Sequence, residues 1–265
     1  MAKNIFVGID NVARKARQPF VGVDGVARKV IGGCLGIDNV ARKFFPGGTP
    51  LELLDVGTSV YMNVDDTPRE FIVVHIGLPS TAYDNSCGGV WLLMKDIYTE
   101  MKWDSSNNDY ANSDVHSYLN NTFVNLFDSS IKNKIKQAKI PYTSGTGQNG
   151  SVYSGSNGLS AKVFLLSFIE LGYSISSSYA NTEGAVLDYF SGASDSERIA
   201  YLNGTAEYWS LRSPINGGYY PTTNAHGVSN TGVRSNVQVT SLSGVRPALI
   251  LPYSTAVDES FNIIA

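Results

Sequence analysis

Three near-identical copies of a nine-residue segment lie near the start of the chain, and they constrain its fold more than any other feature. The copies span residues 7–15, 21–29 and 35–43 and recur at a constant period. Each contains an Asp-Asn or Asp-Gly pair between β-branched residues. This pattern is typical of a tight hairpin turn, because both central residues must tolerate positive φ. The sequence therefore predicts three small β-hairpins.

A lone hairpin is marginally stable in water, and units this short do not bury a core by stacking on one another. Two interpretations stay open. One is a disordered basic arm, because each unit contributes few apolar residues. The other, which we favour, is an attachment or oligomerisation segment over residues 1–45 whose strands are completed by neighbouring chains.

The distribution of charge divides the chain at the same place. Residues 1–45 hold eight of the 20 basic residues and three of the 23 acidic ones, so the remainder holds 12 and 20 and is net acidic. This asymmetry indicates two modules with different partners. Each repeat carries one Arg-Lys pair without the interleaved aromatic residues that single-strand binders use for base stacking. We therefore expect no nucleic-acid partner.

A Pro- and Gly-rich stretch, residues 44–50, ends the repeat segment, and residues 46–265 are enough for one compact domain with its own core. The sequence shows no signal-peptide pattern and no apolar run long enough to span a bilayer. We therefore expect that the protein is synthesised in the cytosol and that it does not insert into a membrane. Cys34 and Cys87 lie on opposite sides of the boundary without patterned partners, and we expect both to be free thiols.

Hydrophobic patterns in the larger domain predict strands over residues 58–64, 70–76, 90–94 and 162–167. A helix capped by Ser113 or Asp114 is expected to bury Val115, Leu119, Phe123 and Leu126. A second helix, capped by Ser129 or Ser130, is expected to run to about Lys139. Residues 143–158 are expected to form a long surface loop, and residues 195–202 a short helix. This order favours an α+β domain in which helices pack against a small antiparallel sheet.

Three motifs in the last third of the chain carry a family resemblance. They are residues 163–167 with Glu170, the Tyr-Trp-Ser-Leu-Arg-Ser-Pro run at residues 208–214, and Gly-Val-Arg-Pro-Ala-Leu-Ile-Leu-Pro at residues 244–252. In this order they resemble the variable proteins of diversity-generating retroelements, a family of C-type lectin-fold domains common in phages and bacteria of the gut. The opening repeats resemble those of structural proteins from tailed phages.

The resemblance implies a C-type lectin-like ligand-binding domain on a phage tail, with a hypervariable surface over residues 208–243. It implies a bacterial cell-surface protein or glycan as receptor, contacts to other virion proteins through the repeats and, by analogy, a homotrimer. The chain departs from the family at Trp209-Ser210, where a Trp-Trp pair is often found. It also lacks the calcium-site pattern of animal lectins, so we expect no calcium-dependent lectin mechanism.

Composition between the last two motifs gives a separate argument. Residues 210–236 contain no Lys, Glu, Met, Trp or Gln, the residues that an Asn codon cannot reach by changes confined to its adenines. Templated diversification through adenines predicts this absence. The alternative is an ordinary loop rich in Gly, Ser, Thr and Asn, in which such residues are also scarce.

The same stretch supplies the candidate contacts. Tyr gives rigid amphipathic contact area, while Asn, Ser and Thr give adaptable hydrogen bonds. The candidate ligand-binding residues are Ser210, Asn216, Tyr219, Tyr220, Thr222, Thr223, Asn224, His226, Ser229 and Asn230. For Tyr219 and Tyr220 a place in the core is the alternative. Trp209, Leu211, Arg212 and Arg246 are expected to be scaffold, with each Arg fixing loop carbonyls or a carboxylate through its planar fork.

The sequence gives little support for a catalytic function. His75, His116 and His226 are scattered, and no motif has metal-ligand spacing, so we expect neither a metal nor another cofactor. A related fold houses a copper-dependent oxidase that converts cysteine to formylglycine, but that activity needs a cysteine pair, and the larger domain has only Cys87. We expect a binding protein rather than an enzyme. The main alternative is a structural protein that decorates the virion without a specific receptor.

Overall fold

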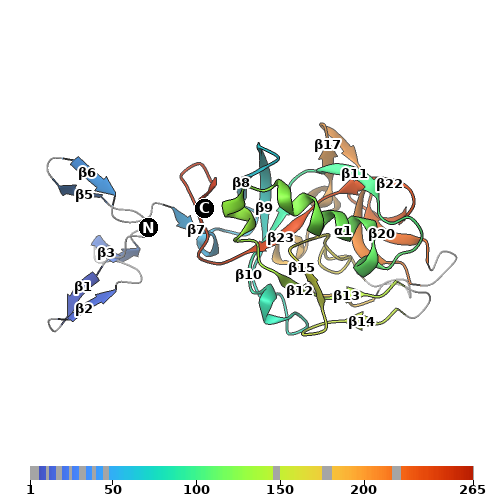
Figure 1. Ribbon diagram of the computed structural model, residues 1–265, viewed down its shortest axis with the longest axis horizontal. Helices are drawn as coiled ribbons and strands as arrows, with labels where there is room; N and C mark the ends of the chain where they lie inside the picture. The colour runs from blue at the N-terminus through green and yellow to red at the C-terminus, as the bar shows by residue number, and fades with distance from the viewer. Residues whose placement is uncertain are drawn as a thin grey trace.

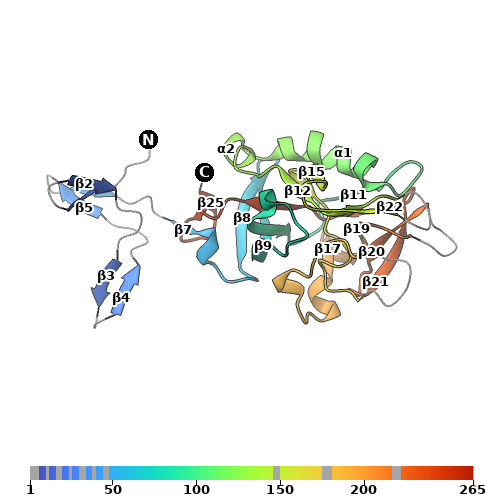
Figure 2. The same cartoon turned by 90° about the horizontal axis from the view of Figure 1, so that it is seen from below.

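A computed structural model gives the fold. It describes the backbone of six short strands between residues 6 and 43, and the backbone and side chains of residues 48–145, 150–174, 181–216 and 222–264. The six strands lie to one side of the larger body that the other residues form (Figures 1 and 2).

Each repeat forms one antiparallel hairpin, as the sequence predicts. The pairs are β1 (Phe6–Ile9) with β2 (Val12–Lys15), β3 (Phe20–Val23) with β4 (Val26–Lys29), and β5 (Cys34–Ile37) with β6 (Val40–Lys43). The register is the same in all three, with the first residue of one strand opposite the lysine that ends the other. Among the described strands, each hairpin is a separate two-stranded sheet.

The first large sheet is antiparallel, with strand order β16-β23-β10-β9-β8. Its strands are β8 (Ser59–Val64), β9 (Thr67–Gly77), β10 (Gly89–Met94), β16 (Val163–Phe164) and β23 (Ala248–Leu251). Every residue of the central strand β10 is buried, which explains its continuous apolar run. Asp65 and Asp66, with φ of 53° and 54°, make the two-residue turn between β8 and β9.

The second large sheet has the order β11-β22-β19-β20-β21. Its strands are β11 (Thr99–Lys102), β19 (Trp209–Pro214), β20 (Asn224–Val228), β21 (Arg234–Gln238) and β22 (Leu242–Val245). β19 runs antiparallel to β20 and parallel to β22, where Trp209 lies opposite Gly244. Four of the five strands therefore come from the segment between residues 208 and 245.

Smaller sheets surround the two large ones. Two-stranded sheets join β12 (Ala138–Ile140) to β15 (Leu159–Ala161), β13 (Tyr142–Thr143) to β14 (Val152–Tyr153), and β17 (Ala200–Leu202) to β18 (Thr205–Glu207). A three-stranded sheet contains β7 (Thr49–Pro50), β24 (Ala256–Val257) and β25 (Ile263–Ile264). Because β7 pairs with β24, the domain begins within the Pro- and Gly-rich boundary. The predicted loop over residues 143–158 is wrong in part, since it contains β14.

Helix α1 (Asp114–Asn121) begins as predicted, with Ser113 Oγ accepting a hydrogen bond of 3.2 Å from the His116 N–H. Helix α2 (Ser129–Lys132) is much shorter than expected. The prediction of a helix to Lys139 is wrong because residues 138–140 form β12, in which Ala138 and Ile140 are buried and Lys139 is exposed. This period of two fits a strand and not a helix.

The other helical turns are of the 3₁₀ type. They are η1 (Leu51–Leu53), η2 (Asn85–Cys87), η3 (Tyr110–Asn112), η4 (Phe123–Leu126), η5 (Asp188–Phe190) and η6 (Asp195–Arg198). Phe123 and Leu126, expected on the first helix, therefore lie in η4. The helix predicted over residues 195–202 ends at Arg198 and is followed by β17, and only the first part of the predicted strand 162–167 is extended as β16.

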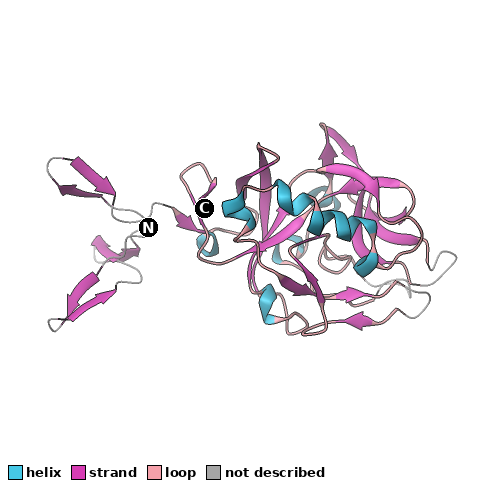
Figure 3. Cartoon of the chain, in the orientation of Figure 1, coloured by secondary structure: helices cyan, strands magenta, loops and turns pink. Residues whose placement is uncertain are grey.

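One hydrophobic core joins the two large sheets. The Trp91 ring is fully buried in this core, 5.5 Å from the Tyr83 ring and 5.4 Å from the Phe164 ring, edge to face in both cases. Trp103, which follows β11, donates from Nε1 to the Leu211 carbonyl of β19 at 2.9 Å. The predicted α+β class is confirmed, with strands far more abundant than helices (Figure 3). In the part of the chain that the structure describes, no helix has the length and apolarity needed to cross a membrane.

Candidate functional site

The predicted variable stretch forms neighbouring strands of the second sheet. β19, β20 and β21 lie side by side, with Ser210 opposite Gly227 and His226 opposite Asn236. Successive side chains of a strand point to opposite faces, so many residues of this stretch point toward the core rather than toward solvent. The exposure of the candidate contacts therefore differs from one residue to the next.

Four of the ten candidate contacts are buried: Ser210, Asn216, His226 and Ser229 are 2, 2, 3 and 8% exposed. The expectation that their side chains lie at the surface is wrong. The His226 ring packs 4.4 Å from the Phe168 ring. Ser229 Oγ lies 2.9 Å from the hydroxyl of Thr231 within a turn. Small polar residues fit these internal positions as readily as they fit a loop. Composition alone therefore does not distinguish a buried position from an exposed one.

The other candidates are distributed differently. Thr222 and Asn230 are exposed, while Thr223 and Asn224 are half-buried. Tyr219 and Tyr220 lie outside the described residues. The residues of this set available to a ligand in the described structure are therefore the four between Thr222 and Asn230.

A buried ion pair lies beneath β19. Arg212 is fully buried, and its two Nη atoms each donate a hydrogen bond of 2.6 Å to the Glu170 carboxylate. Arg212 Nε donates to the Pro141 carbonyl and Nη1 to the Leu165 carbonyl, both at 2.9 Å. One guanidinium thus joins β19 to three other segments, which confirms the predicted scaffold role of Arg212.

Glu170 is saturated with donors. Besides Arg212, its carboxylate accepts from the Tyr83 hydroxyl at 2.7 Å and from the Ser167 N–H at 2.8 Å. The Tyr83 oxygen in turn accepts from the Ala185 N–H at 3.0 Å. Burial, and then the charge of Glu170, raise the pKa of Tyr83, so its hydroxyl stays protonated and acts as a donor.

A second carboxyl group shares the same guanidinium. Glu183 is buried, with Oε1 2.8 Å from Arg212 Nε. Burial raises the pKa of Glu183 to about 7, although Arg212 opposes the shift. Burial lowers the pKa of Arg212, but Glu170 and Glu183 outweigh it, so the guanidinium stays charged. The network therefore holds two carboxyl groups. Arg212 binds the Glu170 carboxylate through two hydrogen bonds, and the pKa of Glu183 is near 7.

Arg246 is a second buried scaffold arginine. Its guanidinium lies 4.8 Å from the centre of the Trp209 ring, and its Nε donates to the Met94 carbonyl at 2.9 Å. Burial lowers the pKa of Arg246 to about 10. Trp209 Nε1 donates to the Arg198 carbonyl at 3.0 Å. The predicted structural role of Trp209 and Arg246 is confirmed.

Several segments converge above the Arg212 network. The fully buried Asn108 donates from Nδ2 to the Ile215 carbonyl at 3.1 Å and to the Asn224 carbonyl at 2.7 Å. Asn181 Nδ2 donates to the Gly150 carbonyl at 2.8 Å. We call this region the loop end and define it by residues 143–145, 150–152, 181–183, 215–216 and 222–224. β13, β14 and β20 mark it in Figure 1, at the opposite end from β7.

Two glycines of the loop end allow close approach of the backbone. A Cβ at Gly145 would lie 1.9 Å from the Asn108 carbonyl oxygen, and one at Gly150 would lie 2.2 Å from the Ser144 carbonyl oxygen. Asn108, Asn181 and Glu183 were not predicted from the sequence. The signal for Asn108 was its place in the polar run of residues 104–109, where Asp104 Oδ1 accepts hydrogen bonds from the next turn.

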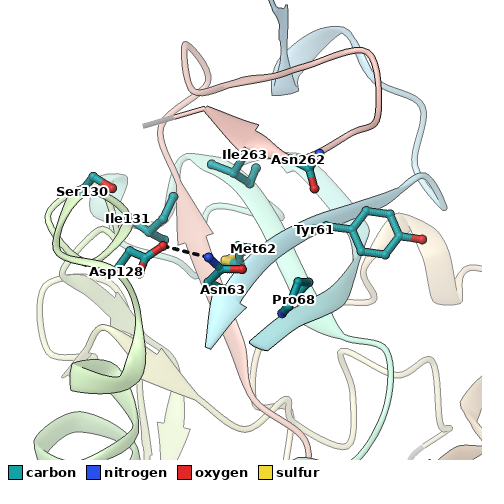
Figure 4. Close-up of a pocket in the computed structure, with 9 residues that line it drawn as sticks. All are labelled: Tyr61, Met62, Asn63, Pro68, Asp128, Ser130, Ile131, Asn262 and Ile263. Atoms are coloured by element: carbon teal, nitrogen blue, oxygen red, sulfur yellow. Dashed lines mark hydrogen bonds between the residues drawn. The ribbon is translucent and has the colours of Figure 1, made fainter. Parts of the chain in front are cut away.

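A cavity of about 230 Å³ lies at the other end, beside β8 and β25 (Figure 4). Asn63 Nδ2 donates to Asp128 Oδ2 across it at 3.2 Å. Among its nine lining residues only Asp128 carries a charge. The cavity therefore lacks the paired acid and base, or nucleophile and base, that a catalytic site uses.

The histidines do not converge. His75 Nδ1 lies 2.8 Å from Asp188 Oδ2, the His116 ring packs 5.2 Å from the Tyr110 ring, and His226 belongs to β20. Burial lowers the pKa of His116. Within residues 48–145, 150–174, 181–216 and 222–264, no three His, Cys, Asp or Glu side chains are grouped so as to hold a metal ion.

Comparison with known proteins gives one family. A family model described as "Domain of unknown function (DUF6273)" matches residues 88–253, which include Arg212, Glu170 and Glu183, all of the second large sheet, and strands β10, β16 and β23 of the first. No curated protein matches the chain. No solved structure matches it either.

Proposed function

The chain belongs to the family described as a domain of unknown function, DUF6273, and we propose that it is a non-enzymatic receptor-binding protein of a phage tail. In this proposal the larger domain is a C-type lectin-like fold. Its loop end contacts a protein or glycan on the surface of a bacterial cell.

The buried Arg212–Glu170 pair is the observation that carries the proposal. It joins the segments around residues 141, 165 and 170 to β19, directly beneath the loop end. A binding surface on loops works best when a rigid base holds the loop ends, because less conformational entropy is lost when the ligand binds. The base here is independent of the side chains above it, so many different surface residues are compatible with it.

The motifs behind the family resemblance support the same view. Arg212 and Glu170 belong to two of them, and Arg246 with Trp209 joins the third to the second. The side chains of these motif residues therefore hold the fold together. In this proposal the diversified residues lie between the second and third motifs. We keep Tyr219, Tyr220, Thr222, Thr223, Asn224 and Asn230 as proposed contacts, and assign Ser210, Asn216, His226 and Ser229 to the support of the sheet.

The hairpin segment is proposed to attach the protein to other virion proteins and to assemble it as a trimer. Its eight basic and three acidic residues contrast with the net acidic domain, so the two parts suit different partners. Several copies on one particle convert weak single contacts into avidity if the geometry lets them bind together. The hairpins also favour the second candidate, a virion decoration protein without a receptor.

The test is binding of the labelled full chain to a panel of gut bacterial cells, measured by flow cytometry. Tyr219→Ala with Tyr220→Ala is expected to abolish binding to any strain that the wild type binds, because aromatic residues dominate interfaces. Tyr253→Ala is the matched control, since Tyr253 is exposed between β23 and β24, at the opposite end. Both variants should unfold at the wild-type temperature.

Either of two results contradicts the proposal. One is undiminished cell binding by the double variant. The other is the absence of binding to every strain while the protein still assembles onto virions, which favours the decoration protein. Sequencing the locus in a propagated population adds an independent measure, because diversification predicts substitutions concentrated between Ser210 and Asn236, with Leu211, Arg212 and residues 245–251 unchanged.

A further inference from the structure

A polar pocket lies between α1, α2 and β15, away from the loop end. Its volume is about 380 Å³, within the range of pockets that hold small ligands. Its lining residues share one property, since seven of the eight are amides, amines or a hydroxyl: Asn120, Asn121, Val124, Asn125, Lys132, Gln137, Ser160 and Lys162. No carboxylate is among them.

The pocket belongs to a segment with an unusual charge. Residues 129–169 contain five lysines and no Asp or Glu, although residues 46–265 as a whole are net acidic. The five are Lys132, Lys134, Lys136, Lys139 and Lys162. A concentration of one charge on one part of an otherwise acidic domain attracts ligands of the opposite sign.

The lysines of the pocket contact only neutral oxygens in the described structure. Lys132 Nζ donates to Asn125 Oδ1 at 3.3 Å, and Lys162 Nζ donates to the Lys132 carbonyl at 3.4 Å. Lys134, Lys136 and Lys139 likewise donate to backbone carbonyls, those of Ile264, Gly88 and Ser156. None of the five forms an ion pair with a described carboxylate.

The carboxylates of Asp84, Asp128 and Glu170 lie beside this segment in sequence or in space, and each has another partner, which for Glu170 is Arg212. Asp128 precedes α2 and accepts a hydrogen bond from Nδ2 of Asn63 on β8. Asp84 accepts from the Ser86 N–H at the start of η2. The ammonium groups of Lys132 and Lys162 are therefore available to an anion from solution.

We propose that this pocket binds the acidic sugar of a polyanionic saccharide, with Lys132 and Lys162 contacting its carboxylate. The amides of Asn121, Asn125 and Gln137 and the hydroxyl of Ser160 both donate and accept hydrogen bonds, as sugar hydroxyls require. The inference goes beyond the receptor proposed for the loop end and does not depend on it.

The composition of the pocket separates this ligand from other anions. No aromatic residue lines it, so it offers no stacking surface for a nucleobase. Val124 is its one apolar lining residue and is buried, so it offers no apolar contact to a lipid chain. Its volume exceeds what a single inorganic anion needs, whereas a sugar ring uses both the amides and the ammonium groups.

The test is calorimetric titration of the full chain at low ionic strength with a trigalacturonate and with a heparin-derived hexasaccharide. Binding of at least one is expected, and Lys132→Gln with Lys162→Gln should weaken it at least tenfold. Ser160→Glu, which places a carboxylate at an exposed position of the pocket, should weaken it similarly. Lys95→Gln with Lys102→Gln is the matched control, because it removes the same charge elsewhere and should change little.

Three results overturn the proposal: no binding of either saccharide, equal binding by the pocket variants and the control, or binding of inorganic phosphate as tight as that of the saccharides. Preferential binding of a DNA oligonucleotide or of anionic phosphatidylserine vesicles overturns it as well. Circular dichroism of each variant establishes that it is folded. Tyr219→Ala with Tyr220→Ala should leave saccharide binding intact, so failure here is distinguishable from failure of the loop-end proposal.

Discussion

The guanidinium of Arg212 and the carboxylate of Glu170 meet through two hydrogen bonds of 2.6 Å, and both side chains are completely buried. The two residues are 42 positions apart in sequence. Desolvation of both charges is expensive, and their attraction together with further hydrogen bonds offsets that cost. Loss of Arg212 leaves Glu170 without its ion-pair partner in the core.

Replacement of Arg212 by Ala is therefore expected to lower the free energy of unfolding by about 3–5 kcal/mol. Urea denaturation followed by circular dichroism measures the loss. Arg234→Ala is the matched control, because Arg234 is exposed on β21, and it should change stability by less than about 0.5 kcal/mol. If the Arg212 variant does not fold, Glu170→Gln takes its place. Wild-type stability in either variant would show that the pair is dispensable.

Glu183 predicts how stability depends on pH. Its pKa is raised from an ordinary value of 4.5 to about 7 in the folded state, so between these values the folded protein holds more protons than the unfolded chain. The contribution of this group is fully present below pH 4.5 and is lost as the pH rises through 7, by about 3 kcal/mol. Glu183→Gln should remove this decline. Denaturation at pH 5 and pH 8 measures it, and an identical slope in the variant contradicts the assignment.

Cys87 is expected to be unreactive in the native protein. It is completely buried, its Sγ donates to the Lys139 carbonyl at 3.3 Å, and burial raises its pKa to about 12. Little thiolate forms near neutral pH, and the thiolate is the nucleophile. In a Cys34→Ser variant, iodoacetamide at pH 8 should label Cys87 only after denaturation, as seen by mass spectrometry. Rapid native labelling would show that the surrounding core opens readily.

Two truncations separate the hairpin segment from the domain. A chain beginning at residue 46 should unfold at the full-length temperature, because the described hairpin strands pair only within each repeat. A chain beginning at residue 55 loses β7 and the buried Leu51, whose N–H donates to the Thr255 carbonyl at 2.7 Å.

Loss of this contact should cost the second truncation about 2–5 kcal/mol. Analytical sedimentation of the first truncation tests assembly. A monomer is expected if the hairpins hold the oligomer together, and an oligomer that persists contradicts that role.

Local sequence patterns predicted the parts of the fold that depend on neighbours in sequence. Asp-Asn and Asp-Gly pairs predicted the hairpins, Ser113 predicted the start of α1, and apolar runs predicted β8, β9 and β10, because turn chemistry, capping and hydrophobic period act over a few residues. The planar fork of Arg212 predicted a structural role but not its partners. The partners Glu170 and Glu183 could not be predicted, because only the tertiary structure brings these distant segments to Arg212.

Tertiary structure alone decided which polar residues of the variable stretch face solvent. Ser210 and Asn230 belong to residue types equally suited to a loop, yet the first is buried in β19 and the second is exposed in the turn after β20. Tertiary structure also decided the conformation of residues 138–140, which were predicted as helix in part. They form β12 because this segment pairs with β15. The sequence by itself determined the repeats, the local elements and the scaffold motifs. Burial and partner choice were set by contacts between residues far apart in the chain, whose packing energy exceeds local preference.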